Sequence, residues 1–137
     1  MIMKKVLFVC VENACRSQMT KWFFNSIVDN AVAGSAGTQP TEKVDPVAVQ
    51  VMKEKDVDIS NFVPKMLMFS MNNEFDFIVT MGCINGCPVT PKNKTIEWEI
   101  MDPKGKTIQQ YGKIRDQIEK HVNKLIKEMI EKWKSRF

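Results

Sequence analysis

Apolar residues form two nearly uninterrupted runs, residues 6–9 and residues 75–81, both rich in Val, Ile and Phe. Runs without polar alternation are typical of strands buried on both faces, as in a parallel sheet. A short segment at residues 31–33, closed by a Gly-Ser-Ala-Gly turn, predicts another strand. Residues 95–100 alternate in polarity and predict a fourth strand with one exposed face.

Between these strands, apolar positions recur at three- and four-residue steps, which predicts helices. One helix is expected over residues 16–30, and a second from Asp45-Pro46 to near Asp56, because Asp can cap a helix and Pro suits its first turn. The third is an amphipathic helix of about seven turns at the end of the chain. Its apolar positions are Ile108, Tyr111, Ile114, Ile118, Val122, Leu125, Met129 and Trp133.

Strands that alternate with helices predict an α/β fold, a three-layer sandwich around a central, mainly parallel, four-stranded sheet. No linker, repeat or low-complexity stretch divides the 137 residues, so we expect a single domain over residues 1–137. In such sheets ligands bind beyond the carboxyl ends of the strands. The segment after the first strand is therefore the first place to look for a site.

The composition is that of an ordinary globular protein, with 44% apolar and 26% charged residues. The net charge of +4 is concentrated in residues 104–137, where ten Lys or Arg face four Asp or Glu, but no aromatic residues interleave with them as in nucleic-acid-binding proteins. We therefore interpret this region as a solvated helix face. The early apolar run, residues 6–11, is too short for a membrane span or a signal peptide, so we expect a cytoplasmic monomer with no membrane or nucleic-acid partner.

Candidate chemistry lies in the segment from Cys10 to Ser17, which leaves the first strand and enters the first helix. Its backbone N–H groups can surround a small anion, helped by the helix dipole, and the planar fork of Arg16 suits two oxygens of a tetrahedral oxyanion. The same field favours the nucleophilic thiolate of Cys10. The predicted oxyanion-binding loop consists of Val11, Glu12, Asn13, Ala14, Cys15, Arg16 and Ser17.

Within this loop, Ser17 is placed to donate a hydrogen bond to the Cys10 sulfur, and Asn13 to brace the loop through its amide. Cys-x5-Arg alone is a weak pattern, and the alternative is a buried thiol at a strand end followed by a solvated helix cap. Its position between a buried strand and a helix favours the functional interpretation.

A carboxyl group for acid catalysis is offered by Asp102-Pro103, in the loop before the last helix. A thiolate that displaces oxygen from phosphorus or arsenic needs an acid to protonate the leaving oxygen. Taken alone, Asp-Pro is as easily a turn or a helix cap.

Cys-x5-Arg-Ser near the N-terminus with a late Asp-Pro resembles the low-molecular-weight protein tyrosine phosphatase superfamily, and most of all its thioredoxin-coupled arsenate reductases. The segments that carry the resemblance are Asn13-Ala14-Cys15-Arg16-Ser17-Gln18-Met19, Val79-Thr80-Met81-Gly82-Cys83, Cys87-Pro88, Asp102-Pro103-Lys104-Gly105-Lys106 and Ile114-Arg115-Asp116-Gln117-Ile118. The resemblance implies that Cys10 is the nucleophile, Arg16 the oxyanion clamp and Asp102 the general acid.

The two late cysteines, Cys83 and Cys87, distinguish between two possible reactions. Hydrolysis of a phosphate ester has no use for Cys83 and Cys87, whereas reduction of As(V) to As(III) needs two electrons, which two thiols supply by forming a disulfide. The resemblance implies a relay from Cys10 to Cys83 to Cys87 that an external thiol reductant resets: thioredoxin, a glutaredoxin-like protein or a small thiol. No bound cofactor or metal is expected, and Cys15 is interpreted as a packing thiol.

Alternatives remain at this stage. One alternative is a zinc site made by the four cysteines, although the Cys-x4-Cys and Cys-x3-Cys spacings suit zinc poorly. Another is that Cys83 and Cys87 are inert structural thiols. A phosphomonoesterase and a non-catalytic oxyanion or redox sensor are the other functional hypotheses. Glu12 replaces a Gly common in the phosphatases, and Lys104-Gly105 replaces their tyrosines, which weakens a phosphotyrosine interpretation.

Overall fold

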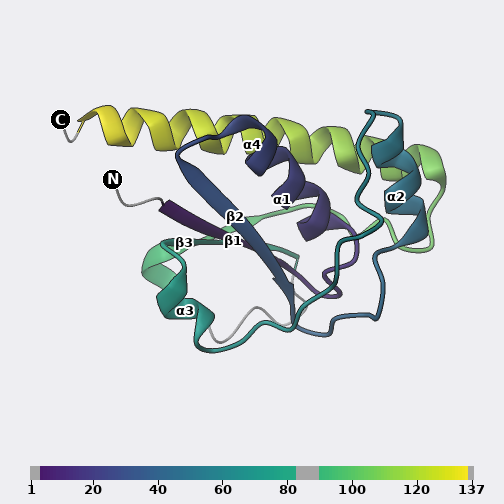
Figure 1. Cartoon of the computed structure of the whole chain (residues 1–137), viewed down its shortest axis with the longest axis horizontal. Coiled ribbons are helices and arrows are strands. Elements are labelled where there is room, and N and C mark those ends of the chain that lie inside the picture. Colours follow the sequence, from purple (N-terminus) through teal and green to yellow (C-terminus); the bar gives the residue numbers. More distant parts are fainter. Residues whose placement is uncertain (1–3, 83–89, 136–137) are drawn as a thin grey trace.

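The chain folds around one parallel sheet, as a computed structural model that describes residues 4–82 and 90–135 shows (Figure 1). The four strands stand in the order β2-β1-β3-β4, and every neighbouring pair is parallel. The α/β class and the four-stranded parallel sheet predicted from the sequence are confirmed. The elements are β1 (Lys4–Cys10), α1 (Arg16–Ile27), β2 (Ala31–Gly37), α2 (Pro46–Lys53), α3 (Met71–Glu74), β3 (Phe77–Met81), η1 (Lys92–Lys94), β4 (Thr95–Trp98) and α4 (Ile108–Ser135).

The sheet separates a large hydrophobic core on one face from a small one on the other. The sheet and the segments that cover its two faces are the three layers of the predicted sandwich. Along β1, Val6 and Phe8 point into the large core with α1, α2 and α4, whereas Leu7 and Val9 point into the small core on the opposite face. Each set recurs every second residue, as the pleat of a strand requires. The small core is closed by side chains from α3 and the segments beside it.

The main correction concerns β2, which continues through residues 34–37 instead of ending in a turn there. These small residues pair with β1, and the register places Gly37 opposite Cys10. A Cβ on Gly37 would lie 2.6 Å from the carbonyl oxygen of Val11. Gly37 is therefore required because the chain after β1 approaches the backbone at this point.

The three predicted helices begin where the sequence predicts and end a few residues earlier or later, whereas the short α3 was not predicted. Asp45 caps α2 by accepting a hydrogen bond from the Val47 N–H at 2.9 Å, and Pro46 is its first residue. α1 ends at Ile27 and α2 at Lys53, short of the predicted ends, whereas α4 extends to Ser135. No helix in the described part of the chain is long and apolar enough to cross a membrane.

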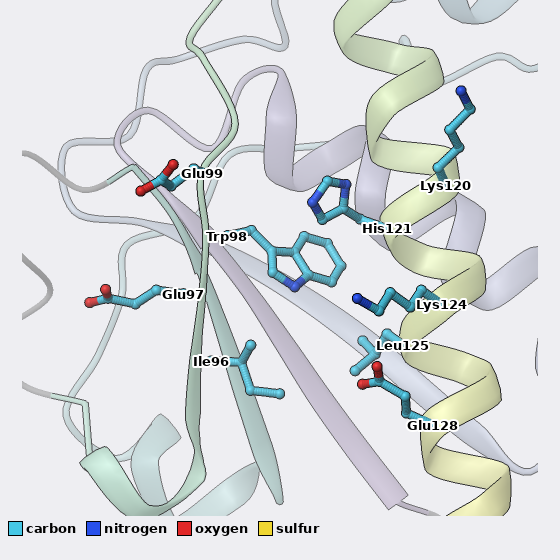
Figure 2. Close-up of a pocket in the computed structure, with 9 residues that line it drawn as sticks. All are labelled: Ile96, Glu97, Trp98, Glu99, Lys120, His121, Lys124, Leu125 and Glu128. Carbon is cyan, nitrogen blue, oxygen red and sulfur yellow. The ribbon is translucent and has the colours of Figure 1, made fainter.

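The face of α4 that packs on the sheet includes His121, the single histidine of the chain. Its ring lies against Trp98 of β4 with 5.1 Å between ring centroids, in a groove between β4 and α4 (Figure 2). His121 is partly buried, and its Nδ1 donates a hydrogen bond to the backbone carbonyl oxygen of Gln117 at 2.9 Å.

Candidate active site

The loop between β1 and α1 is held in place by Asn13, which is fully buried and has a positive φ of 51°. Its side-chain oxygen accepts hydrogen bonds from the Lys65 N–H at 2.8 Å and from Gln18 Nε2 at 3.1 Å. Its side-chain nitrogen donates to Ser17 Oγ at 2.6 Å. Asn13 therefore ties the loop both to α1 and to the segment after α2, and it tolerates the left-handed backbone that the loop needs.

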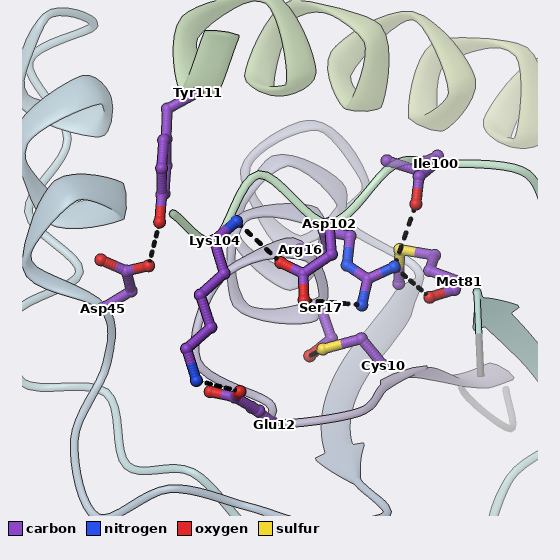
Figure 3. Close-up of polar contacts among 10 residues, drawn as sticks. All are labelled: Cys10, Glu12, Arg16, Ser17, Asp45, Met81, Ile100, Asp102, Lys104 and Tyr111. Atoms are coloured by element: carbon purple, nitrogen blue, oxygen red, sulfur yellow. Dashed lines mark hydrogen bonds and ion pairs between the residues drawn. The ribbon is translucent and has the colours of Figure 1, made fainter. Parts of the chain in front are cut away.

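The Cys10 sulfur lies at the carboxyl end of β1, buried, 2.9 Å from Ser17 Oγ (Figure 3). Ser17 already accepts a hydrogen bond from Asn13, so its own proton is available to the sulfur. A thiolate accepts hydrogen bonds and has none to give. The arrangement therefore suits a nucleophilic thiolate at Cys10.

Arg16 begins α1 and is buried, with 3% of its surface exposed, so it is not a solvated helix cap. Its Nη1 donates to the carbonyl oxygens of Met81 at 2.6 Å and Ile100 at 3.0 Å. Gly82 makes room for this guanidinium, because a Cβ there would lie 2.8 Å from Nη1. The arginine is thus fixed by backbone atoms at the ends of β3 and beyond β4, and these partners were not predicted from the sequence.

Asp102 faces the same guanidinium from the solvent side, with 3.7 Å between its Oδ2 and Arg16 Nη2. Its other oxygen accepts a hydrogen bond from the Lys104 N–H at 3.1 Å, which fixes the carboxylate within its turn. The Lys104 ammonium in turn forms an ion pair with Glu12 at 2.5 Å. The predicted nucleophile, clamp and acid therefore share one site, although they come from segments far apart in the chain.

These side chains line a narrow cleft that is open to solvent. It lies at the carboxyl ends of the strands, where the sequence analysis expects a ligand. The lining residues are Cys10, Glu12, Ala14, Cys15, Arg16, Asp45, Asp102 and Lys104. Its charged and sulfur-bearing walls suit a small oxyanion.

Cys15, which lines this cleft, and Tyr111, which contacts the lining residue Asp45, are neutral groups. Burial, and next the Asp45 carboxylate, raise the pKa of Cys15 well above its ordinary value, so it remains a thiol. Tyr111 donates a hydrogen bond to Asp45 Oδ2 at 2.5 Å, and burial together with this bond raises the pKa of its phenol. Asp45 thus has a second function beyond capping α2, which the sequence analysis missed because Tyr111 is 66 residues away.

Cys83 and Cys87 lie outside the described residues, so their predicted relay remains a prediction. Cys10 and Cys15 are free thiols. Within residues 4–82 and 90–135, no cluster of three His, Cys, Asp or Glu side chains is arranged to hold a metal ion.

Comparison with known proteins gives consistent matches over most of the chain. The family model described as low molecular weight phosphotyrosine protein phosphatase matches residues 5–135. A curated arsenate reductase of Staphylococcus aureus is 34% identical over 125 residues, which cover 88% of this chain and 95% of that protein.

Solved structures agree with these matches. An arsenate reductase of Archaeoglobus fulgidus superimposes with a TM-score of 0.76 at 32% identity, over 88% of this chain and 98% of that one. A thioredoxin-dependent arsenate reductase of Corynebacterium glutamicum gives 0.79 at 29% identity, over 95% of this chain and 63% of that one.

Proposed function

The chain belongs to the low molecular weight phosphotyrosine protein phosphatase family, and from this premise we propose that it reduces arsenate to arsenite with Cys10 as the nucleophile. The curated relatives at 34% identity are arsenate reductases. One observation supports the chemistry above the others. The Cys10 sulfur, hydrogen-bonded to Ser17, shares a small cleft with the buried guanidinium of Arg16 and with Asp102.

In the first step, the Cys10 thiolate attacks the arsenic of bound arsenate. A sulfur–arsenic bond forms, an arsenic–oxygen bond breaks, and protonated Asp102 gives its proton to the leaving oxygen, which departs as water. Arg16 Nη2 and the backbone N–H groups of the loop stabilise the remaining oxygens. Nη1 is already engaged by two carbonyl oxygens, so the guanidinium is orientated before the substrate arrives.

In the second step, the Cys83 thiolate attacks the Cys10 sulfur. A disulfide forms, the sulfur–arsenic bond breaks, and its electron pair stays on arsenic, which leaves as arsenite. Cys87 then attacks Cys83, which releases the Cys10 thiolate and leaves a Cys83–Cys87 disulfide. Gly82, which precedes Cys83 in the sequence, lies against Arg16, and this supports Cys83 as the second thiol.

The disulfide has to be reduced by an external thiol reductant. We propose thioredoxin, since a matching structure is that of a thioredoxin-dependent arsenate reductase. A glutaredoxin-like protein or a small thiol would supply the same two electrons. The protein is proposed to act as a monomer, which gel filtration tests directly.

A coupled assay tests the reaction. Arsenate, thioredoxin, thioredoxin reductase and NADPH should give steady NADPH oxidation that Cys10→Ser, Cys83→Ser and Cys87→Ser each abolish. Asp102→Asn should slow it by about 10²- to 10⁴-fold. In a single turnover, Cys87→Ser should stop with a Cys10–Cys83 disulfide, which peptide mass spectrometry identifies.

The competing hypotheses give different results in the same experiment. A phosphomonoesterase would hydrolyse p-nitrophenyl phosphate with Cys83→Ser and Cys87→Ser fully active and would show no arsenate-dependent NADPH oxidation. An oxyanion or redox sensor would bind arsenate and change its thiol state without turnover. Either result would refute the reductase assignment.

A further inference from the structure

An ion pair crosses the mouth of the cleft and joins two loops that are 92 residues apart in sequence. Lys104 Nζ lies 2.5 Å from Glu12 Oε1, and both residues line the same cleft as Cys10 (Figure 3). The Lys104 side chain is 64% exposed and that of Glu12 is 25% exposed. Exposed ion pairs contribute little to folding stability, so this pair has to be explained by its position over the site.

The pair is connected to the proposed acid as well as to the oxyanion loop. The Lys104 backbone N–H donates to Asp102 Oδ1 at 3.1 Å, while Asp102 Oδ2 faces Arg16. The side chain of Lys104 therefore holds the oxyanion loop while its backbone holds the acid. Together these contacts set how far the two loops stand apart.

The pair also changes the charge that an incoming anion meets. An unpaired Glu12 carboxylate at the rim would repel a dianion, as a like charge does at short range. The ammonium of Lys104 cancels that charge, and the hydrogen bond that it donates to Glu12 raises the pKa of Lys104, so the ammonium persists. The result is a rim that is electrically neutral but sterically occupied.

The reaction geometry determines what has to pass this rim. In an in-line displacement at Cys10, the leaving oxygen lies opposite the sulfur and points out of the loop toward the acid. In arsenate or inorganic phosphate this apical atom is an oxygen that carries nothing further. In a phosphate monoester it carries the organic group, which would have to extend past Asp102 into the space that Glu12 and Lys104 close.

We propose that the Glu12–Lys104 ion pair determines substrate class at this site, admitting free inorganic oxyanions and excluding organic phosphate esters. The proposal rests on the proposed function only in that it concerns the same cleft. It assigns Glu12, a carboxylate in an anion-binding loop, a steric and positional role that its charge alone would not suit. Neither residue touches the reacting atoms, so both act as specificity determinants.

Titration calorimetry with two non-reacting probes tests the proposal without requiring turnover. Inorganic phosphate has only oxygen at the apical position, whereas phenylphosphonate has to place its ring there when its three oxygens occupy the loop. Glu12→Ala and Lys104→Ala should each raise the affinity for phenylphosphonate relative to phosphate by about tenfold, a discrimination of the size that a small steric group gives. In the double alanine variant, the affinity for phenylphosphonate relative to phosphate should rise no further than in either single variant, because each single substitution already breaks the same ion pair.

The charge-swapped protein, Glu12→Lys with Lys104→Glu, should restore the wild-type affinity ratio. Lys106→Ala is the matched control, because Lys106 is an exposed lysine two residues further on with no ion pair in the described part of the chain. Thermal unfolding of each variant checks that the fold is intact. An unchanged ratio in both single variants, or a swapped protein that retains the single-variant ratio, would overturn the proposal.

This result and the coupled assay can fail independently. A wild-type protein without arsenate-dependent NADPH oxidation refutes the reductase assignment, whatever the two affinities are. A reductase whose ratio is insensitive to both variants refutes the specificity role alone.

Discussion

Gly82→Ala would place a methyl group against the guanidinium that is assigned to the oxyanion. Gly82 follows β3 with a φ of +69°, and a Cβ there would lie 2.8 Å from Arg16 Nη1. The same nitrogen donates to the carbonyl oxygens of Met81 and Ile100. Because both carbonyl oxygens belong to the backbone, the guanidinium cannot move away from the new methyl group without losing one of these two hydrogen bonds.

Two contributions set the magnitude of the effect. Alanine in the left-handed region is destabilised by roughly 1–2 kcal/mol. Losing one buried hydrogen bond from a charged group adds about 1.5–3 kcal/mol. Together we therefore expect the free energy of unfolding to fall by about 2.5–5 kcal/mol, and kcat/KM for arsenate to fall by about 10²-fold if the clamp moves by an ångström.

Urea unfolding followed by circular dichroism measures the first quantity and the coupled NADPH assay the second. Gly105→Ala is the matched control for stability, because Gly105 has a φ of +80° but a Cβ there would have nothing within 4 Å. Gly105→Ala should lower the free energy of unfolding only by the backbone contribution. If the two variants are destabilised equally and Gly82→Ala retains its kcat/KM, the packing of Gly82 against Arg16 does not constrain the site.

Four further expectations concern groups around the cleft. Ser17→Ala removes the hydrogen bond to the nucleophilic sulfur and should slow arsenate reduction by about 10- to 100-fold in the coupled assay. Tyr111→Phe leaves Asp45 with one fewer donor and should lower the free energy of unfolding by about 1–3 kcal/mol at neutral pH. Because the pKa of Tyr111 is raised on folding, wild-type stability should decline as pH rises above the ordinary phenol value of about 10, and urea titrations across pH should show that this decline is absent in Tyr111→Phe. Cys15→Ala should retain most of the activity, and iodoacetamide should leave Cys15 unmodified at neutral pH while peptide mapping finds the nucleophile labelled, since burial raises the pKa of Cys15. Phosphate at about 100 times its Kd should stabilise the wild type by about 2.7 kcal/mol and leave the unfolding of Arg16→Met unchanged.

The parts of the fold that could be predicted are those in which burial leaves a periodic trace in the sequence. The apolar runs of β1 and β3 and the amphipathic pattern of α4 are of this kind. β2 could be predicted only in part, because its second half consists of Gly, Ser and Ala, residues that also form turns. Small residues stand there because the chain after β1 passes close to Gly37, a contact between segments that one-dimensional periodicity does not contain.

The residues of the site also differ in whether the sequence alone could predict their role. The residues from Cys10 to Ser17 are contiguous, so their chemistry could be interpreted from spacing alone, and Asp45 was found as a helix cap for the same reason. The carbonyls that hold Arg16 have no sequence signal, since every residue has a carbonyl. The pairing of Glu12 with Lys104 depends on how two distant loops meet, and each residue alone is an ordinary surface charge.

Two arginines are buried in the described part of the chain, and they show why backbone partners suit the proposed function. Arg115 lies between the carboxylates of Glu54 and Asp116, at 2.7 and 2.9 Å, so its charge is compensated within the protein. Arg16 is held mainly by neutral carbonyls, and the carboxylate that faces it, Asp102, lies 3.7 Å away and is 44% exposed. A buried charge with weak compensation is unfavourable until an anion pairs with it. Arg115 also donates to the carbonyl oxygen of Val51 at 2.8 Å, so both guanidinium groups have a backbone partner. The two arginines differ in whether close carboxylates compensate the charge, as at Arg115, or leave it available for an anion, as at Arg16.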